Sequence, residues 1–195
     1  IHKETSRIQI ARNLGLDKST ISSIISELLR IGIVSETTEG EAGPQGGRKP
    51  VMLMLNRSYG CVVGIEMRPE SYNAVAVDLE GSVIYSKFEL VQVSGANFRE
   101  VLLEVANRVR DELKRTGVPL LGIGVGVAGV VDPQHGIIRY SIPLQITGSF
   151  DFRSAIAEGY DLPIFVENDA NACAWGELAF HRGKRLRNFL FVLVE

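Results

Sequence analysis

The stretch Phe165-Val166-Glu167-Asn168-Asp169-Ala170-Asn171-Ala172 marks the point at which an apolar strand gives way to a helix. It places an amide, Asn168, beside a carboxylate, Asp169. Such a pair can bind neighbouring sugar hydroxyls, and a carboxylate alone can accept the proton of a hydroxyl that attacks a phosphate. The alternative is structural, because short polar side chains also cap a helix that begins near Ala170. The stretch therefore predicts a sugar sensor or a sugar kinase, or else a capped helix.

The residues around this stretch alternate between apolar strands and amphipathic helices. The predicted elements are strands over 60–66, 73–78 and 83–89, a helix over 98–113 with Asn97 as its cap, strands over 120–128 and 164–167, a helix over 170–180 and a last strand over 188–194. The first three strands form a meander, and later strands alternate with helices. This order predicts an α/β fold in which helices flank a mixed sheet.

The first 57 residues have a different organisation. Apolar residues follow helical spacing from Arg7 to Leu29, with one break at Gly15 and with Asp17 or Ser19 as the cap of the second helix. This spacing is that of a helix-turn-helix, although a helical hairpin that packs on another surface would share it. The second helix would present to a DNA major groove the short or cationic side chains of Lys18, Ser19, Thr20, Ser22, Ser23 and Ser26.

Two further strands, over 31–34 and 51–55, flank a Gly-rich segment over 37–50. This segment carries Arg48 and Lys49 next to glycines, and a narrow basic tip of this kind can lie in a minor groove. A disordered interdomain linker is the alternative. In this order, helices, turn and basic tip predict a winged helix-turn-helix DNA-binding domain over 1–57.

Composition limits the classes of protein that fit. The chain has 195 residues, 45% of them hydrophobic, which is enough for a real core. Residues 1–57 carry eight Lys and Arg against six Asp and Glu, whereas the rest carries thirteen against seventeen. The net charge of the first part is thus positive and that of the rest negative, as expected if the first part binds phosphate groups. Cys61 and Cys173 lie in apolar runs without metal-ligand spacing, so buried free thiols are predicted. With no membrane-spanning stretch, the expected location is cytoplasmic.

The order of these motifs resembles the ROK family of repressors and sugar kinases. The resemblance rests on Gly46–Pro50, Val63–Glu66, Gly122–Asp132 and Glu167–Glu177 and covers nearly the whole chain. It implies an actin-like (ribonuclease H-like) ATPase-type lobe over 58–187. Residues 188–195 would then begin a second lobe whose remainder is absent, so we expect this chain to be a fragment. Members with the extra N-terminal domain look like repressors that respond to xylose, glucose or N-acetylglucosamine.

The resemblance also implies roles for individual residues. Asn168 and Asp169 would bind sugar hydroxyls, with Asp169 at the position of the catalytic base in family kinases. Gly129 would lie in a ligand loop, although Gly126–Gly129 also suits a strand end packed tightly against a helix. No cofactor is expected in this fragment, and no metal ligand can be named. The resemblance implies that the family's structural zinc would be bound by residues beyond the end of this chain.

The segment Glu66-Met67-Arg68-Pro69-Glu70 distinguishes a sensor from a kinase. A kinase of this fold needs a Gly-rich phosphate loop here, because bare backbone N–H groups bind the phosphates. Arg68 and Pro69 replace the glycines, and Glu70 adds negative charge. The segment therefore argues against ATP binding, unless the absent half supplies another nucleotide geometry.

The sequence thus predicts a sugar-responsive transcriptional repressor of ROK type. Its partners would be operator DNA, a monosaccharide whose identity stays open, and further copies in a homodimer or homotetramer, without a membrane. An ATP-dependent sugar kinase that uses Asp169 as its base is the first alternative. An adaptor whose winged helix binds protein is the second.

Overall fold

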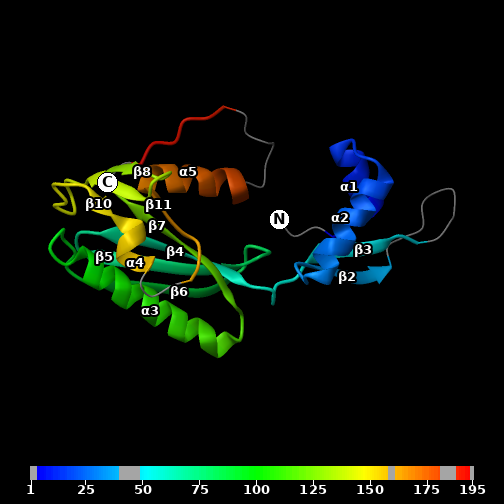
Figure 1. Ribbon diagram of the computed structural model, residues 1–195, viewed down its shortest axis with the longest axis horizontal. Helices are drawn as coiled ribbons and strands as arrows, with labels where there is room; N and C mark the ends of the chain where they lie inside the picture. Colours follow the sequence, from blue (N-terminus) through cyan, green and yellow to red (C-terminus); the bar gives the residue numbers. More distant parts are fainter. Residues whose placement is uncertain (1–3, 40–48, 158–160, 181–187, 194–195) are drawn as a thin grey trace. The chain divides into compact units, whose positions relative to one another are not determined.

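The chain forms two compact units, residues 1–59 and residues 60–195. The computed structural model describes residues 4–39, 49–157, 161–180 and 188–193 (Figure 1). The first unit holds two helices and three short strands, and the second holds the other strands and helices. No helix within these ranges is both long enough and apolar enough to cross a membrane.

The first unit combines two helices with a three-stranded antiparallel sheet. Its elements are α1 (Arg7–Leu14), α2 (Lys18–Arg30), β1 (Thr5–Ser6), β2 (Val34–Glu39) and β3 (Val51–Leu55), with sheet order β1-β3-β2. Ser6 and Gln9 form a capping box at the start of α1. Gly15 ends α1 in the left-handed conformation, with φ of 67°, as the predicted turn requires. The small core consists of Ala11, Ile21, Ile25 and Leu53.

Both ends of α2 differ in detail from the prediction. Asp17 stands at the N-cap, but its side chain makes no capping hydrogen bond. The strand predicted over 31–34 begins only at Val34, because Ile31 still caps α2 and Gly32 turns the chain with φ of 84°. The glycine therefore serves as a turn after the helix and does not lie in a strand.

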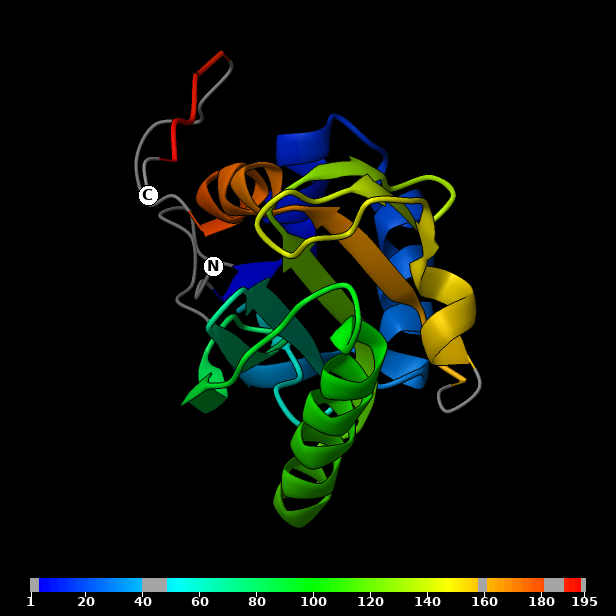
Figure 2. The same cartoon turned by 90° about the vertical axis from the view of Figure 1, so that its left-hand side faces the viewer.

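The second unit is built on a five-stranded mixed sheet of order β11-β7-β4-β5-β6. Strands β4 (Cys61–Arg68), β5 (Ser71–Asp78) and β6 (Val83–Leu90) form the predicted meander, and β7 (Leu120–Val127) and β11 (Ile164–Asn168) extend the sheet in parallel. Helices α3 (Phe98–Thr116) and α4 (Phe152–Ala157) lie on one face, and α5 (Asp169–Phe180) lies on the other (Figures 1 and 2). The predicted mixed sheet flanked by helices is confirmed.

A smaller antiparallel sheet in this unit was not predicted. Its strands are β8 (Val130–Asp132), β9 (Ile137–Tyr140) and β10 (Phe150–Asp151), in the order β10-β9-β8. Strands of two to four residues are too short to show an alternating pattern of apolar residues. The sequence pattern therefore gave no signal for this sheet.

The start of α3 also differs from the prediction. Asn97 occupies the N-cap position, but its side chain makes no capping hydrogen bond. Its Oδ1 accepts a hydrogen bond from the Ser94 backbone N at 2.7 Å, and its Nδ2 donates to the Gln92 carbonyl at 2.9 Å. Asn97 thus shapes the turn that leads into α3.

The last predicted strand, over 188–194, is not formed by the residues that are described there. Residues 188–193 contain no strand, and apolar side chains such as Leu190 are exposed. A strand needs a neighbour to satisfy its backbone hydrogen bonds, and no described residue supplies one. An apolar run is therefore not sufficient for a strand.

The main core lies between the large sheet and helices α3 and α4. Every second residue of β4 from Cys61 to Met67 is buried there, and Phe98, Leu102 and Leu113 of α3 are fully buried. The Phe98 ring meets Phe150 edge to face, with 5.3 Å between ring centroids. Because side chains alternate along a strand, the intervening residues face the side on which α5 lies.

Candidate functional site

The carboxyl ends of three parallel strands meet at one edge of the large sheet. The register places Gly126 of β7 between Glu66 of β4 and Glu167 of β11. At this edge β11 ends with Asn168, and α5 begins with Asp169. In open α/β sheets, ligands bind outside the carboxyl ends of the strands. This edge is therefore the candidate site.

Asn168 links the start of α5 to the loop that follows β7. Its Oδ1 accepts a hydrogen bond from the backbone N of Asn171 at 3.1 Å, which is the geometry of a helix cap. Its Nδ2 donates to the carbonyl of Gly129 at 3.0 Å, a residue 39 positions earlier in the chain. The capping role considered for this stretch therefore falls to Asn168, and the same side chain also holds the Gly129 loop.

Glu167 and Asn171 fix the orientation of Asn168. The Glu167 Oε1 accepts hydrogen bonds from the Asn168 backbone N at 2.8 Å and from the Asn171 Nδ2 at 3.1 Å. The backbone N of Asn171 in turn donates to the Asn168 side chain. With the bond to Gly129, these contacts leave the Asn168 amide one further N–H in its donor capacity.

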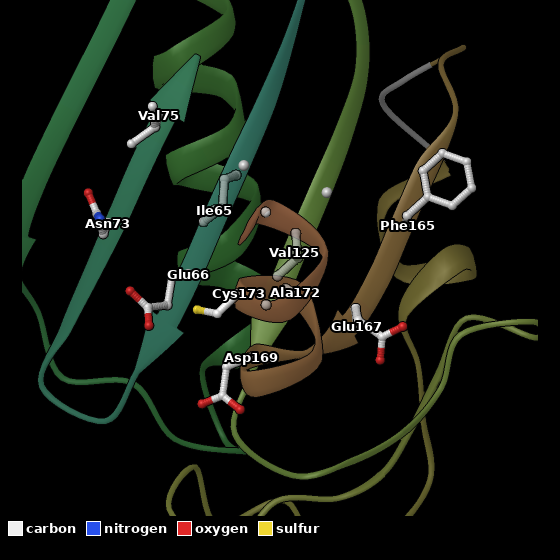
Figure 3. Close-up of a pocket in the computed structure, with 14 residues that line it drawn as sticks. Ile65, Glu66, Asn73, Val75, Val125, Phe165, Glu167, Asp169, Ala172 and Cys173 are labelled. Carbon is white, nitrogen blue, oxygen red and sulfur yellow. The ribbon is translucent and has the colours of Figure 1, made fainter. Parts of the chain in front are cut away.

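Asp169 keeps most of its hydrogen-bonding capacity. Its Oδ1 accepts a hydrogen bond from the backbone N of Ala170 at 2.8 Å, and no described residue donates to its other oxygen. The carboxylate lies at the mouth of a pocket beside Glu66 and Cys173 (Figure 3). Asp169 can therefore accept hydrogen bonds from a ligand hydroxyl without losing the start of α5.

The third predicted ligand residue, Gly129, lies where the chain approaches itself closely. A Cβ atom at Gly129 would lie 2.5 Å from the carbonyl oxygen of Tyr140, so only glycine fits. The tight packing considered for this segment is therefore present at Gly129, but against the end of β9 and not against a helix. Gly129 is needed for close packing against Tyr140 at the end of β9, and its carbonyl accepts a hydrogen bond from Asn168.

The pocket extends from this edge along the face of the sheet that carries α5. Its volume is about 560 Å³, and Figure 3 shows the small side chains of α5 above a sheet floor that includes glycines. Its lining includes Glu66, Asn73, Gly126, Glu167, Asp169 and Cys173. Cys173 is exposed here and not buried as predicted, because it faces this hollow. Partial burial, and then the negative charges of Glu66 and Asp169, raise the pKa of its thiol.

The segment from Glu66 to Glu70 forms a tight hairpin. β4 ends at Arg68 and β5 begins at Ser71, so Pro69 and Glu70 alone make the turn. The carbonyls of these two residues accept hydrogen bonds from the backbone N–H groups of Val93 and Val91, at 2.8 and 3.0 Å. Arg68 is paired with Glu66 at 2.8 Å. The turn contains no glycine and its proline has no N–H, so its residues do not fit a nucleotide phosphate.

The predicted DNA-contacting residues of α2 are all exposed. Ile21 and Ile25 are the buried residues of α2 and lie in the core of the first unit. The exposed residues are Lys18, Ser19, Thr20, Ser22, Ser23 and Ser26. The Ser26 hydroxyl donates to the carbonyl of Ser22 at 2.8 Å, so it is partly engaged within the helix.

The basic tip is only partly described. Lys49 is exposed, whereas Arg48 lies outside the described residues. No group of three or more His, Cys, Asp or Glu side chains in the described ranges could hold a metal ion.

Asp132 in the small sheet is held by two cationic or polar neighbours. His135 Nδ1 lies 3.0 Å from its Oδ1, and Arg139 Nη2 donates to its Oδ2 at 2.7 Å. These bonds, that of His135 first, lower the pKa of Asp132 to about 2. Because the folded-state pKa lies below the usual value of about 4, the ionised group stabilises the fold above pH ~4.

This stabilisation is expected to be lost as the pH falls from about 4 to about 2. Asp132→Asn should therefore flatten the fall in melting temperature over that interval, measured by thermal unfolding at several pH values. Asp161→Asn, which replaces an exposed carboxylate elsewhere in the same unit, should keep the wild-type pH profile. Identical profiles for wild type and Asp132→Asn would contradict this assignment.

Three residues that shape the candidate site were not predicted from the sequence. Glu167 and Asn171 lie within the quoted stretch, and their spacing of four residues around a helix start was the available signal. Ser141 lies in a segment for which no element was predicted. Its hydroxyl donates to the carbonyl of Ala128, a contact between residues 13 positions apart that no local pattern indicates.

Together, the mixed sheet, its flanking helices and the site at the carboxyl edge define an actin-like fold of the kind found in sugar kinases. The ROK family model matches residues 62–195, and the chain belongs to the ROK family. The recognition made from the sequence motifs is confirmed.

Curated relatives match almost the whole chain. The xylose repressor of Bacillus subtilis is 31% identical over 191 residues, which are 97% of this chain and 49% of that protein. The transcriptional dual regulator NagC of Escherichia coli is 23% identical over 97% of this chain and 46% of that protein. The chain thus spans about half the length of the relatives that it matches.

Solved structures support the same fold. A ROK family transcriptional regulator, described as a homologue of the E. coli MLC protein, superposes with a TM-score of 0.73 and 22% identity over 90% of this chain and 44% of its own. A ROK glucokinase from Streptomyces griseus, solved with glucose and AMPPNP, gives a TM-score of 0.54 and 24% identity over 64% of this chain and 38% of its own.

Proposed function

We propose that this chain is the DNA-binding and first-lobe part of a sugar-responsive transcriptional repressor. The observation that carries the proposal is the closed Pro69-Glu70 hairpin, which stands where a kinase of this fold needs its phosphate loop. Phosphoryl transfer depends almost wholly on positioning the donor phosphates, so losing the loop removes catalysis before it removes sugar binding. Relatives named as repressors, matched over 97% of this chain, support the same choice.

In this proposal the first unit is a winged helix-turn-helix. Helices α1 and α2 are joined by a turn at Gly15, and the antiparallel strands β2 and β3 follow as the stem of a wing. The exposed face of α2 would enter a major groove, with Lys18 at the phosphates and the serines near base edges. Arg48 and Lys49 would reach the minor groove from the wing.

The sugar would bind at the carboxyl edge of the large sheet. Asp169 supplies a charged acceptor and Asn168 an adjacent N–H donor, which together suit two neighbouring hydroxyls. The loop that contains Gly129 would form another side of the sugar site, next to Asn168 and Asp169. The other sugar contacts would come from the second lobe of the complete protein.

Sugar and operator binding would be coupled through the arrangement of subunits in a homodimer or homotetramer. Half-sites on one face of DNA lie about 34 Å apart per helical turn, so a small change in subunit angle can break the second contact. A coupling of about 1–3 kcal/mol would change operator occupancy five- to hundredfold. The test is operator affinity of the full-length protein with and without xylose, glucose and N-acetylglucosamine; an affinity that none of a panel of monosaccharides changes would refute sugar sensing.

A sugar kinase is the alternative function, because ROK kinases share the fold and the family resemblance implies that Asp169 stands at the position of their base. The residues of the hairpin do not fit ATP with Mg²⁺, so we expect no sugar-dependent ADP release from the full-length protein. Turnover that disappears in Asp169→Asn would reverse the choice between sensor and kinase.

Lys18→Ala is expected to weaken operator binding and to reduce the slope of log affinity against log salt concentration by about 1, because one phosphate contact is lost. Lys114→Ala provides a matched control, since Lys114 lies on α3 of the other unit and pairs with Asp111 at 3.0 Å. The measurement is operator affinity at several salt concentrations. An unchanged slope for Lys18→Ala would favour a protein-binding adaptor over a DNA-binding module.

A further inference from the structure

Ser141 is a buried polar residue that the predicted site does not include. It follows β9 and is only 1% exposed. Its hydroxyl donates to the carbonyl of Ala128 and accepts a hydrogen bond from the backbone N of Leu144 at 3.2 Å. A buried hydroxyl with both its donor and an acceptor position in use is a fixed contact and not a solvent-facing group.

The loop after β7 is therefore held by two side chains that come from different parts of the chain. Ser141 binds the carbonyl of Ala128, and Asn168 binds the carbonyl of Gly129 at 3.0 Å. The two hydrogen bonds therefore restrain two successive carbonyl groups of the loop. The absence of a Cβ at Gly129 allows the chain after β9 to approach closely enough for this arrangement.

Ser141 is itself held on a rigid turn. The backbone N–H and carbonyl of Ser141 pair with those of Ile146, both at 2.9 Å. Between them Gln145 adopts a positive φ of 55°, a conformation that persists in a non-glycine residue only when its surroundings impose it. The carbonyl of Leu144 also accepts a hydrogen bond from the backbone N of Gly95 at 2.6 Å. The Ser141 hydroxyl therefore lies on a turn that is hydrogen-bonded to Gly95, in the segment before α3.

We propose that Ser141 is a positioning residue for the sugar site: it holds the Ala128–Gly129 loop against the start of α5, so that the loop, Asn168 and Asp169 form one preorganised wall. This inference rests on the proposed sugar-binding function. Its physical basis is preorganisation. Residues that already have their ligand-binding arrangement lose less conformational entropy when the ligand binds. A shift of about 1 Å in such a wall can cost a large factor in binding or rate.

The test uses the full-length protein with Ser141→Ala. We expect about tenfold weaker sugar binding, unchanged operator affinity without sugar, and about five- to tenfold faster hydrogen exchange at the amides of residues 129–131. Ser154→Ala is the matched control. It removes a hydroxyl that donates to Asp151 at 2.7 Å at the start of α4, and should leave sugar affinity and loop exchange unchanged.

A purely structural role for Ser141 predicts a different result. In that case Ser141→Ala would lower the melting temperature but keep the wild-type sugar affinity at temperatures where the protein is folded, and the inference would be wrong. Unchanged exchange at residues 129–131 would overturn it as well. If the wild-type protein binds no sugar, the proposed function fails, and the exchange rates alone then decide whether Ser141 holds the loop.

Discussion

Asp169→Asn is expected to lower sugar affinity about 10- to 100-fold while leaving operator affinity without sugar unchanged. A hydrogen bond to a charged group contributes about 1.5–3 kcal/mol, and the substitution replaces a charged acceptor by a neutral amide. The introduced amide oxygen can still accept the hydrogen bond from the Ala170 N–H, so the start of α5 is retained. The loss should therefore appear in sugar titration and not in thermal unfolding without ligand.

The control for this experiment is Asp161→Asn, which makes the same chemical change at an exposed position of the same unit. It should bind sugar with wild-type affinity. Equal sugar affinity for Asp169→Asn and wild type would show that the ligand, if any, binds elsewhere. A drop in melting temperature of Asp169→Asn without ligand would instead assign the carboxylate a structural role.

The strand-to-helix stretch made this part of the site predictable. An apolar strand followed by Asn168 and Asp169 at the start of a helix has a local signature, and local patterns are what a sequence reveals. The different roles of Asn168 and Asp169 were not predictable from the sequence. They depend on a hydrogen bond that the Asn168 amide donates to the carbonyl of Gly129, 39 residues away. Only the folded chain shows that Asn168 caps α5 and binds the Gly129 carbonyl, while Asp169 bonds the Ala170 N–H through one oxygen.

The exposure of Cys173 and the failure of the last predicted strand have a common physical cause. Both predictions treated apolar surroundings in the sequence as evidence of burial in the fold. Burial depends on what packs against a residue, and the described residues leave the hollow beneath Cys173 open and give 188–193 no partner strand. A long helix such as α3, with seven buried residues, makes its backbone hydrogen bonds locally and shows a periodic apolar pattern, so it was predicted correctly.

Two phenylalanines of the second unit differ strongly in burial. Substitution of the buried one gives the largest expected change in stability. Phe98 is fully buried at the start of α3, whereas Phe88 on the edge strand β6 is 62% exposed. Phe98→Ala removes a ring from a packed core and from its edge-to-face contact with Phe150, so it should lower the free energy of unfolding by about 3–5 kcal/mol.

Phe88→Ala makes the same chemical change where there is little packing to lose, and should change the free energy of unfolding by no more than about 0.5 kcal/mol. Denaturant unfolding of the two variants beside wild type measures both values. Comparable losses would mean that Phe88 is covered in the complete protein. A small decrease in the free energy of unfolding for Phe98→Ala would contradict the core between α3 and the sheet. This core also supports β4 and β7, whose carboxyl ends form part of the candidate site.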